Sequence, residues 1–147
     1  MISKDCKIHN SVKITSPVNL YGCTLKKDVF VGPFVEIQKD ALIDEGTRVQ
    51  SHTFICSEVT VGKNCFIGHG VMFINDTFSN NSINFSGPYE KTIIENNVII
   101  GSNATILPVK IVSGVIIGAG SVVTKSFPDN VVIAGNPARI IKNIQVA

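Results

Sequence analysis

Four polar side chains in the middle of the chain have the types and spacing for acid–base or orienting chemistry. His52 precedes His69 by 17 residues, and the adjacent Asn75 and Asp76 follow within seven residues of His69. A neutral imidazole accepts protons near its natural working pH, a carboxamide can hydrogen-bond an amine and a carbonyl at once, and a carboxylate can bind hydroxyls or act as a base. The structural alternative is that the histidines are polar corner residues and that Asn-Asp starts a turn.

Length and composition limit what can surround these residues. The chain has 147 residues, of which 44% are hydrophobic and 16% charged, with a formal charge of +2. The length and hydrophobic fraction favour a single ordered domain, and the low charged fraction argues against a helical bundle. The small net charge predicts no nucleic-acid partner. We also expect no membrane span, because no apolar run reaches roughly 18 residues. The N-terminus has no apolar leader and the four cysteines include no CxxC pair, which favours a cytoplasmic protein with free thiols.

Apolar residues recur along the chain with a period of six, which fits neither a helix nor an alternating strand. A second row of small or β-branched residues follows four positions after each key residue. The key residues are Ile8, Ile14, Leu20, Leu25, Val31, Ile37, Ile43, Val49, Ile55, Val61, Ile67, Phe73, Ile94, Ile100, Ile106, Ile111, Ile117 and Val123. The second row, from Val35 onward, is Val35, Ala41, Thr47, Thr53, Val59, Cys65 and Val71.

This pattern predicts an all-β fold, a parallel β-helix of stacked triangular coils. Each aliphatic key residue points inward from a flat face, a small residue points inward near the corner, and glycine or polar residues make the turn. Three six-residue faces give one coil of 18 residues, and each coil buries its apolar residues against its neighbours. We expect a single domain, residues 1–147, with about six coils over residues 8–75 and 94–128.

Two segments lack the repeat. Residues 76–92 are rich in Asn, Ser, Gly and Pro and predict one loop ejected from a corner. The loop is long enough to be functional, and a flexible surface insertion is the alternative. Residues 129–147 are expected to cap the last coil, with a short closing helix over Ala138–Ile144.

The repeats, the loop and the chain ending closely resemble the hexapeptide-repeat acyltransferases. The ending reads IGAGSVVTK from Ile117 to Lys125 and AGNPAR from Ala134 to Arg139, and IGHGVMFIND from Ile67 to Asp76 is similar to nucleotide-sugar N-acetyltransferases of surface-polysaccharide pathways. The resemblance implies a left-handed coil, acetyl-CoA as co-substrate, no metal, and a dTDP- or UDP-linked amino sugar as acceptor for O-antigen or related glycan synthesis. It also implies a homotrimer, which would cover Phe34, Phe54, Phe66 and Val122.

Within this resemblance, His69, Asn75 and Asp76 are the expected catalytic residues. Asn75 would position the amino sugar beside the thioester, and His69 or Asp76 would act as base, unless the departing thiolate of coenzyme A takes the proton, as in some relatives. The expected substrate-binding residues are His52, one layer below His69 and nearly alongside it, with Asn84 and Tyr89. The expected cofactor-binding residues are Ala104, Gly118, Ala119 and Gly120 along the pantetheine arm, and Lys125, Arg139 and Lys142 near the phosphates.

Several alternatives stay open. A sugar O-acetyltransferase of the same fold would acetylate a hydroxyl, which needs a base more than an amine does. The basic residues near the C-terminus can instead be a solvated tail, and the segment from Ile106 to Val112 is one residue short, which can shift the groove. A structural β-solenoid would favour a flat Thr-rich face without a loop. A zinc site of three histidines is disfavoured because His9 lies far from His52 and His69 in the sequence.

Overall fold

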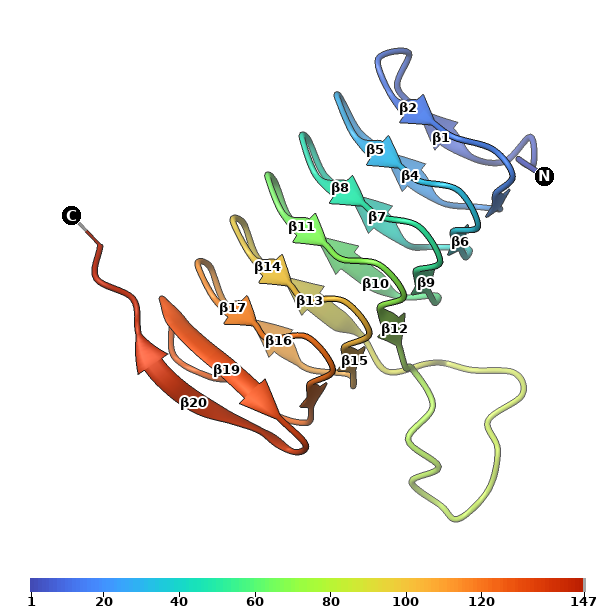
Figure 1. The fold of residues 1–147 in the computed structure, drawn as a ribbon. Helices are drawn as coiled ribbons and strands as arrows, with labels where there is room; N and C mark the ends of the chain where they lie inside the picture. Colours follow the sequence, from blue (N-terminus) through green and yellow to red (C-terminus); the bar gives the residue numbers. More distant parts are fainter. Residues whose placement is uncertain (147) are drawn as a thin grey trace.

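Short strands wind into three parallel sheets around one axis, and the coils stack from the N-terminus to the C-terminus (Figure 1). The computed structural model describes residues 1–146. The first sheet contains β1 (Lys7–Ile8), β4 (Thr24–Leu25), β7 (Leu42–Ile43), β10 (Val59–Val61), β13 (Thr92–Ile94) and β16 (Lys110–Ile111). The second sheet contains β2 (Lys13–Ile14), β5 (Phe30–Val31), β8 (Arg48–Val49), β11 (Phe66–Ile67), β14 (Ile99–Ile100), β17 (Ile116–Ile117), β19 (Val131–Gly135) and β20 (Ala138–Asn143). The third sheet contains β3 (Asn19–Leu20), β6 (Glu36–Ile37), β9 (Phe54–Ile55), β12 (Met72–Phe73), β15 (Thr105–Ile106) and β18 (Val122–Val123).

The architecture is the predicted left-handed parallel β-helix, and the six-residue repeat identifies its interior. From Leu20 onward every key residue is buried, and so is every member of the second row from Val35 to Val71. Ile8 and Ile14 are only partly buried, because the first coil has a neighbour on one side only. The second row includes polar members that the coils satisfy internally. The hydroxyl of Thr53, for example, donates to the Gly68 carbonyl at 2.8 Å and accepts the Val71 N–H at 3.3 Å.

The predicted closing helix over Ala138–Ile144 is wrong, because Ala138–Asn143 forms strand β20. β20 pairs antiparallel with β19, and β19 extends the second sheet by pairing parallel with β17. The unpaired edge of β19 offers a full row of backbone partners to an extended chain, whereas a helix would leave that edge open. No helix in residues 1–146 has the length and apolarity needed to cross a membrane.

The loop leaves the body at the corner between the third and first sheets. β12 ends at Phe73 and β13 begins at Thr92, so the loop consists of residues 74–91. Thr92, expected as its last residue, already pairs with Val59 on the coil below. In Figure 1 the loop hangs away from the stack of coils between β12 and β13.

Candidate active site

The predicted catalytic residues lie at two different corners of one coil. His69 lies in the turn between β11 and β12, where the chain passes from the second sheet to the third. Asn75 and Asp76 follow β12, at the base of the loop. Strand β12 therefore separates the histidine from the asparagine and the aspartate within one chain. The sequence could have predicted this separation, because Asp76 follows His69 by seven positions and one face of the coil has only six.

The turns between the second and third sheets form a continuous edge, which we call the histidine edge. Backbone bonds link its coils: the N–H of Gly70 donates to the Ser51 carbonyl at 3.0 Å, and that of Asn103 donates to the His69 carbonyl at 2.8 Å. The side chain of His69 is exposed on this edge. Each turn on the histidine edge has two residues, and the second of them, from the N-terminal coil onward, is Phe34, His52, Gly70, Asn103 and Gly120.

His52 lies one coil below His69, as expected. It does not lie directly under His69, however, and its ring does not stack on the ring of His69. The Gly70 N–H bond to Ser51 places His52 in line with Gly70, one position after His69. The ring of His52 stacks on Phe34, with 4.8 Å between the centroids and 29° between the planes. The two histidines thus share an edge, with His52 forming part of an aromatic pair toward the N-terminal end.

Small residues continue the histidine edge toward the C-terminal end. Gly120 has a left-handed φ of 70° and open space where a Cβ would lie, and Ala119 before it is exposed. Gly118 lies just inside this turn, against the side chain of Ala134. Ala104 is completely buried in the interior, so its side chain faces the core. A slender ligand could lie against the exposed backbone of Ala119 and Gly120.

In the loop, Asp76 organises the backbone. One carboxylate oxygen accepts the N–H of Phe78 at 3.0 Å, and the other accepts the N–H of Asn84 at 2.8 Å. The side chain of Asn84 accepts the Gly87 N–H at 2.9 Å and donates to the Pro88 carbonyl at 3.1 Å. Asp76 and Asn84 therefore form a hub that folds the loop on itself.

The two remaining loop residues predicted as functional also have partners within the chain. Asn75 donates its amide N–H to the Ser57 carbonyl at 3.2 Å, which ties the start of the loop to the coil below. The hydroxyl of Tyr89 donates to the Phe85 carbonyl at 3.2 Å. The carboxamide oxygen of Asn75 is not engaged by that bond and can accept a further hydrogen bond.

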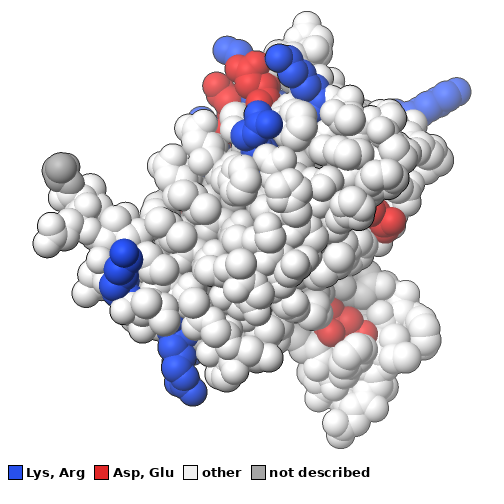
Figure 2. Space-filling model, in the orientation of Figure 1, with Lys and Arg blue, Asp and Glu red and all other residues white. Residues whose placement is uncertain are grey.

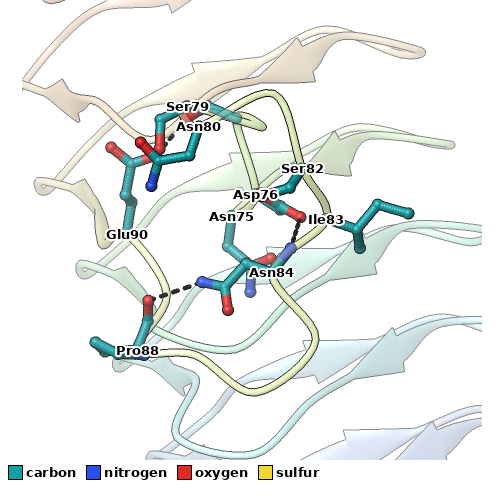
Figure 3. A pocket seen from close by; sticks show the side chains of 10 residues that line it. Asn75, Asp76, Ser79, Asn80, Ser82, Ile83, Asn84, Pro88 and Glu90 are labelled. Carbon is teal, nitrogen blue, oxygen red and sulfur yellow. Dashed lines mark hydrogen bonds between the residues drawn. The ribbon is translucent and has the colours of Figure 1, made fainter.

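A polar pocket of 400 Å³ lies within the loop (Figure 3). Asn75, Asp76 and Asn84 line it, which brings three predicted residues together. Thr77 and Glu90 also line it, and their hydroxyl and carboxylate are hydrogen-bonded at 2.7 Å across the neck of the loop. Sequence reasoning missed this pair, whose signal is a hydroxyl and a carboxylate at opposite ends of the non-repeating segment.

The charge of the loop pocket is one-sided. Its lining contains two carboxylates, those of Asp76 and Glu90, and no Lys or Arg. Lys91, the last residue of the loop, does not line the pocket. On the face seen in Figure 2, acidic atoms lie in the hollow beside the loop, and basic side chains project from the C-terminal end. A pocket of this kind attracts an ammonium group and hydrogen-bonds hydroxyls, and it repels phosphate.

Two of the three basic residues predicted near the C-terminus share a groove. Lys125 and Arg139 line a groove of 350 Å³ together with Phe127, whose ring centroid lies 5.5 Å from the Lys125 ammonium. Lys142 lies further along β20, opposite Val132. The groove can hold a phosphate group between two cations.

The four cysteines are free thiols, as the sequence predicts. Burial raises the pKa of Cys23 to about 12 and that of Cys56 to about 11. These two thiols therefore stay protonated at neutral pH and are poor nucleophiles. Among residues 1–146, no group of three His, Cys, Asp or Glu side chains is placed to hold a metal ion.

Comparison with known proteins agrees with the coiled fold. The family model described as "Hexapeptide repeat of succinyl-transferase" matches residues 58–72 and 91–125, on both sides of the loop. This chain belongs to the hexapeptide-repeat acyltransferase family. The bifunctional protein GlmU of Thermotoga petrophila is 35% identical over 94% of this chain. The chain spans only 33% of GlmU, so it corresponds to about a third of the curated relatives that it matches.

Two solved acyltransferase structures match the chain over a larger share of their own length. A galactoside acetyltransferase in complex with coenzyme A is 32% identical, with a TM-score of 0.72 over 82% of this chain and 64% of that chain. AntD, an N-acyltransferase from Bacillus cereus, was solved as a point mutant in complex with dTDP-4-amino-4,6-dideoxyglucose and coenzyme A. It is 27% identical, with a TM-score of 0.54 over 99% of this chain and 81% of that chain.

Proposed function

We propose that this chain transfers an acetyl group from acetyl-CoA to the amine of a dTDP- or UDP-linked amino-deoxy sugar, for surface-polysaccharide synthesis in the cytoplasm. The observation that carries the proposal is the loop pocket, where two carboxylates and several amides and hydroxyls meet without a cation. Such a lining suits an amino sugar. The similarity to AntD, whose structure contains an amino sugar nucleotide and coenzyme A, supports the same substrate class.

In this proposal coenzyme A lies along the C-terminal part of the histidine edge. The pantetheine arm passes Gly118, Ala119 and Gly120, and the phosphates bind near Lys125 and Arg139, with Lys142 further out. The thioester then lies beside His69. The amine nitrogen attacks the thioester carbonyl carbon, backbone N–H groups stabilise the oxyanion, and the C–S bond breaks. His69 accepts the proton that the nitrogen loses and passes it to the departing thiolate.

The acceptor requires a second chain in this proposal. Because His69 and the loop pocket lie at different corners, we propose a homotrimer in which the loop of one chain reaches the histidine edge of its neighbour. Asn75 then orients the acceptor through its free carboxamide oxygen. Asp76 and Asn84 shape the pocket, because their polar groups already bond to loop backbone. Tyr89 does not line the pocket and stabilises the loop through its bond to the Phe85 carbonyl.

O-acetylation of a sugar hydroxyl is the second candidate. The galactoside acetyltransferase favours it, since that structure superposes with the higher TM-score, 0.72 against 0.54 for AntD. A hydroxyl is a weaker nucleophile than a neutral amine, so this reaction would depend more strongly on His69 as base.

A panel of acceptors separates the two candidates. The chain is incubated with acetyl-CoA, EDTA and dTDP- or UDP-linked amino sugars or plain hexoses. Free thiol is followed, and products are identified by mass and NMR. We expect acetylated amines and a trimer mass by light scattering. Acetylation of hexoses alone would replace the N-acetyl proposal with the O-acetyl one, and activity lost to EDTA and restored by zinc would overturn both.

A further inference from the structure

The N-terminal end of the histidine edge carries an aromatic pair that the proposed reaction does not use. Phe34 and His52 stack with their ring centroids 4.8 Å apart, on successive coils. Phe34 is 58% exposed in the single chain although it is a large apolar residue, so either a neighbouring chain of the trimer or a ligand has to cover it. An exposed phenyl ring supported from behind by an imidazole is a platform on which a planar ring can stack.

The backbone at this pair is held in an unusual conformation. Phe34 has a φ of 63° and His52 a φ of 65°, in the left-handed region. Most of the other left-handed residues of the chain are Asn, Asp or Gly, which tolerate this conformation. The same edge uses Gly70, Asn103 and Gly120 at the equivalent positions of later coils. A bulky aromatic residue there costs conformational energy and gives the coil no core packing, which points to a functional reason.

A groove beside Phe34 supplies polar partners for the edge of a ring. Pro17, Val18, Asn19 and Glu36 line this groove of 350 Å³ together with Phe34 and Val35. The Asn19 side chain donates to the Glu36 carboxylate at 3.1 Å, which fixes the orientation of its amide. One amide N–H and the carboxamide oxygen of Asn19 then stay available as a donor and an acceptor.

We propose that Phe34, supported by His52, binds the base of the nucleotide-linked acceptor, with Asn19 at the edge of that base. The identity of this ligand rests on the proposed function. Phe34 lies two coils below His69, or about 10 Å at the spacing of neighbouring strands. A nucleotide sugar with its base on Phe34 would extend toward His69, which meets coenzyme A from the other side. The loop pocket repels phosphate, so the nucleotide needs contacts outside it. The groove beside Phe34 has Glu36 as its charged residue, so it suits the base and not the diphosphate.

Nucleotide binding tests the proposal without depending on catalysis. The full chain is titrated with dTDP, UDP and inorganic pyrophosphate by calorimetry. We expect a nucleoside diphosphate to bind and Phe34→Ala to weaken it about tenfold or more, because a base stacked on an aromatic ring loses that contact. Pyrophosphate affinity should not change, and Phe34→Tyr should restore nucleotide binding. In wild type, the imidazole NMR signals of His52 should shift when the nucleotide is added.

Phe78 provides a matched control, since it is also 58% exposed and left-handed, with a φ of 55°. Phe78→Ala should keep wild-type nucleotide affinity, and a loss there instead would move the base into the loop and overturn the proposal. A wild-type chain that binds neither nucleotide would also overturn it. So would a Phe34→Ala chain that keeps its affinity, or one that loses its trimer mass.

The base site and the proposed reaction can fail separately. Phe34-dependent binding of dTDP or UDP, without acetyl transfer to any amino sugar, would keep the base site and reject the reaction. Acetyl transfer with the same KM for the nucleotide sugar in wild type and Phe34→Ala would keep the reaction and reject the base site.

Discussion

The coiled body and the loop are held together in different ways. In the body, backbone N–H groups bond to carbonyls one coil away, and apolar residues such as Ile100 fill the interior. In the loop, residues 74–91, the side chains of Asp76 and Asn84 bind nearby backbone. The family model matches parts of the body on both sides of the loop and leaves residues 73–90 out. Stability thus depends on repetition in the body, whereas in the proposed function the choice of acceptor depends on a few polar side chains in the loop.

His69 gives the sharpest exception, because it belongs to the body yet should matter only for activity. If it is the base, His69→Ala should lower kcat by about 10²–10⁴-fold. Its side chain is exposed at a turn, so the melting temperature should not change. Thiol release and thermal unfolding measure the two effects, and His9→Ala, on the first coil, is the control. Wild-type turnover with an unchanged pH profile would assign the proton to the thiolate of coenzyme A.

Two adjacent isoleucines of β14 test the body alone. Ile100 is completely buried, whereas Ile99 is 44% exposed on the outside of the same strand. Ile100→Ala should lower the free energy of unfolding by about 2–5 kcal/mol, since it leaves a cavity between coils. Ile99→Ala should change it by less than about 0.5 kcal/mol. Urea denaturation measures both values, and equal losses would mean that the side chains facing the interior do not dominate stability.

Asp76 tests whether the loop is organised separately from the body. Asp76→Ala removes the acceptor of the Phe78 and Asn84 N–H groups, so the loop should open and the KM for the acceptor should rise about tenfold. Cleavage within residues 77–90 by a protease should become faster, while the melting temperature of the body stays the same. Asp76→Asn, which keeps one acceptor oxygen, should lie in between. A fall in kcat with a changed pH profile and no faster cleavage would instead make Asp76 a base.

The smallest effect is expected where the loop rejoins the body. Thr53 and Thr92 both point inward, and the Thr53 hydroxyl bonds to the coil above. Among residues 1–146, the buried Thr92 hydroxyl has no hydrogen-bond partner. The residue that stands to Thr92 as Gly68 stands to Thr53 is Leu107, in the shortened step between Ile106 and Ile111.

Valine substitutions at these two threonines should therefore differ. Thr53→Val should cost about 1–3 kcal/mol, because it leaves the Gly68 carbonyl and the Val71 N–H without their partner. Thr92→Val should be close to neutral or slightly stabilising, about 0–1 kcal/mol. Urea denaturation of both variants measures the difference. A loss at Thr92 as large as that at Thr53 would show that its hydroxyl has a partner in solution.

The interior of the body could be predicted from the sequence because each coil imposes the same demand. A face buried against its neighbours needs one large apolar residue every six positions, so residues such as Ile67 and Ile100 could be assigned by counting. Counting failed at Ala138–Asn143, where the residues carry no such period. There the open edge of β19 decided the conformation, and local sequence does not reveal an edge.

The site could be predicted only in part. The sequence identified Asn75, Asp76 and Asn84, which line one pocket. It could not say whether the Asp76 carboxylate faces a ligand or the loop backbone, because both uses favour the same residue in a turn. The stacking of Phe34 on His52 depends on how the turns of two successive coils align, and the residue types alone do not reveal this alignment.

The register across the loop has a consequence for how this chain can change. β13 pairs with β10 from Val59↔Thr92 to Val61↔Ile94, so the ladder resumes as if the intervening residues were a simple turn. The entropy of closing such a segment grows only logarithmically with its length, by about 0.6 kcal/mol for each doubling. The segment can therefore be lengthened, shortened or exchanged for that of a relative with little penalty. Under the proposed function, in which the loop binds the acceptor, a lineage can acquire a new acceptor by changing this one insertion while the coils stay the same.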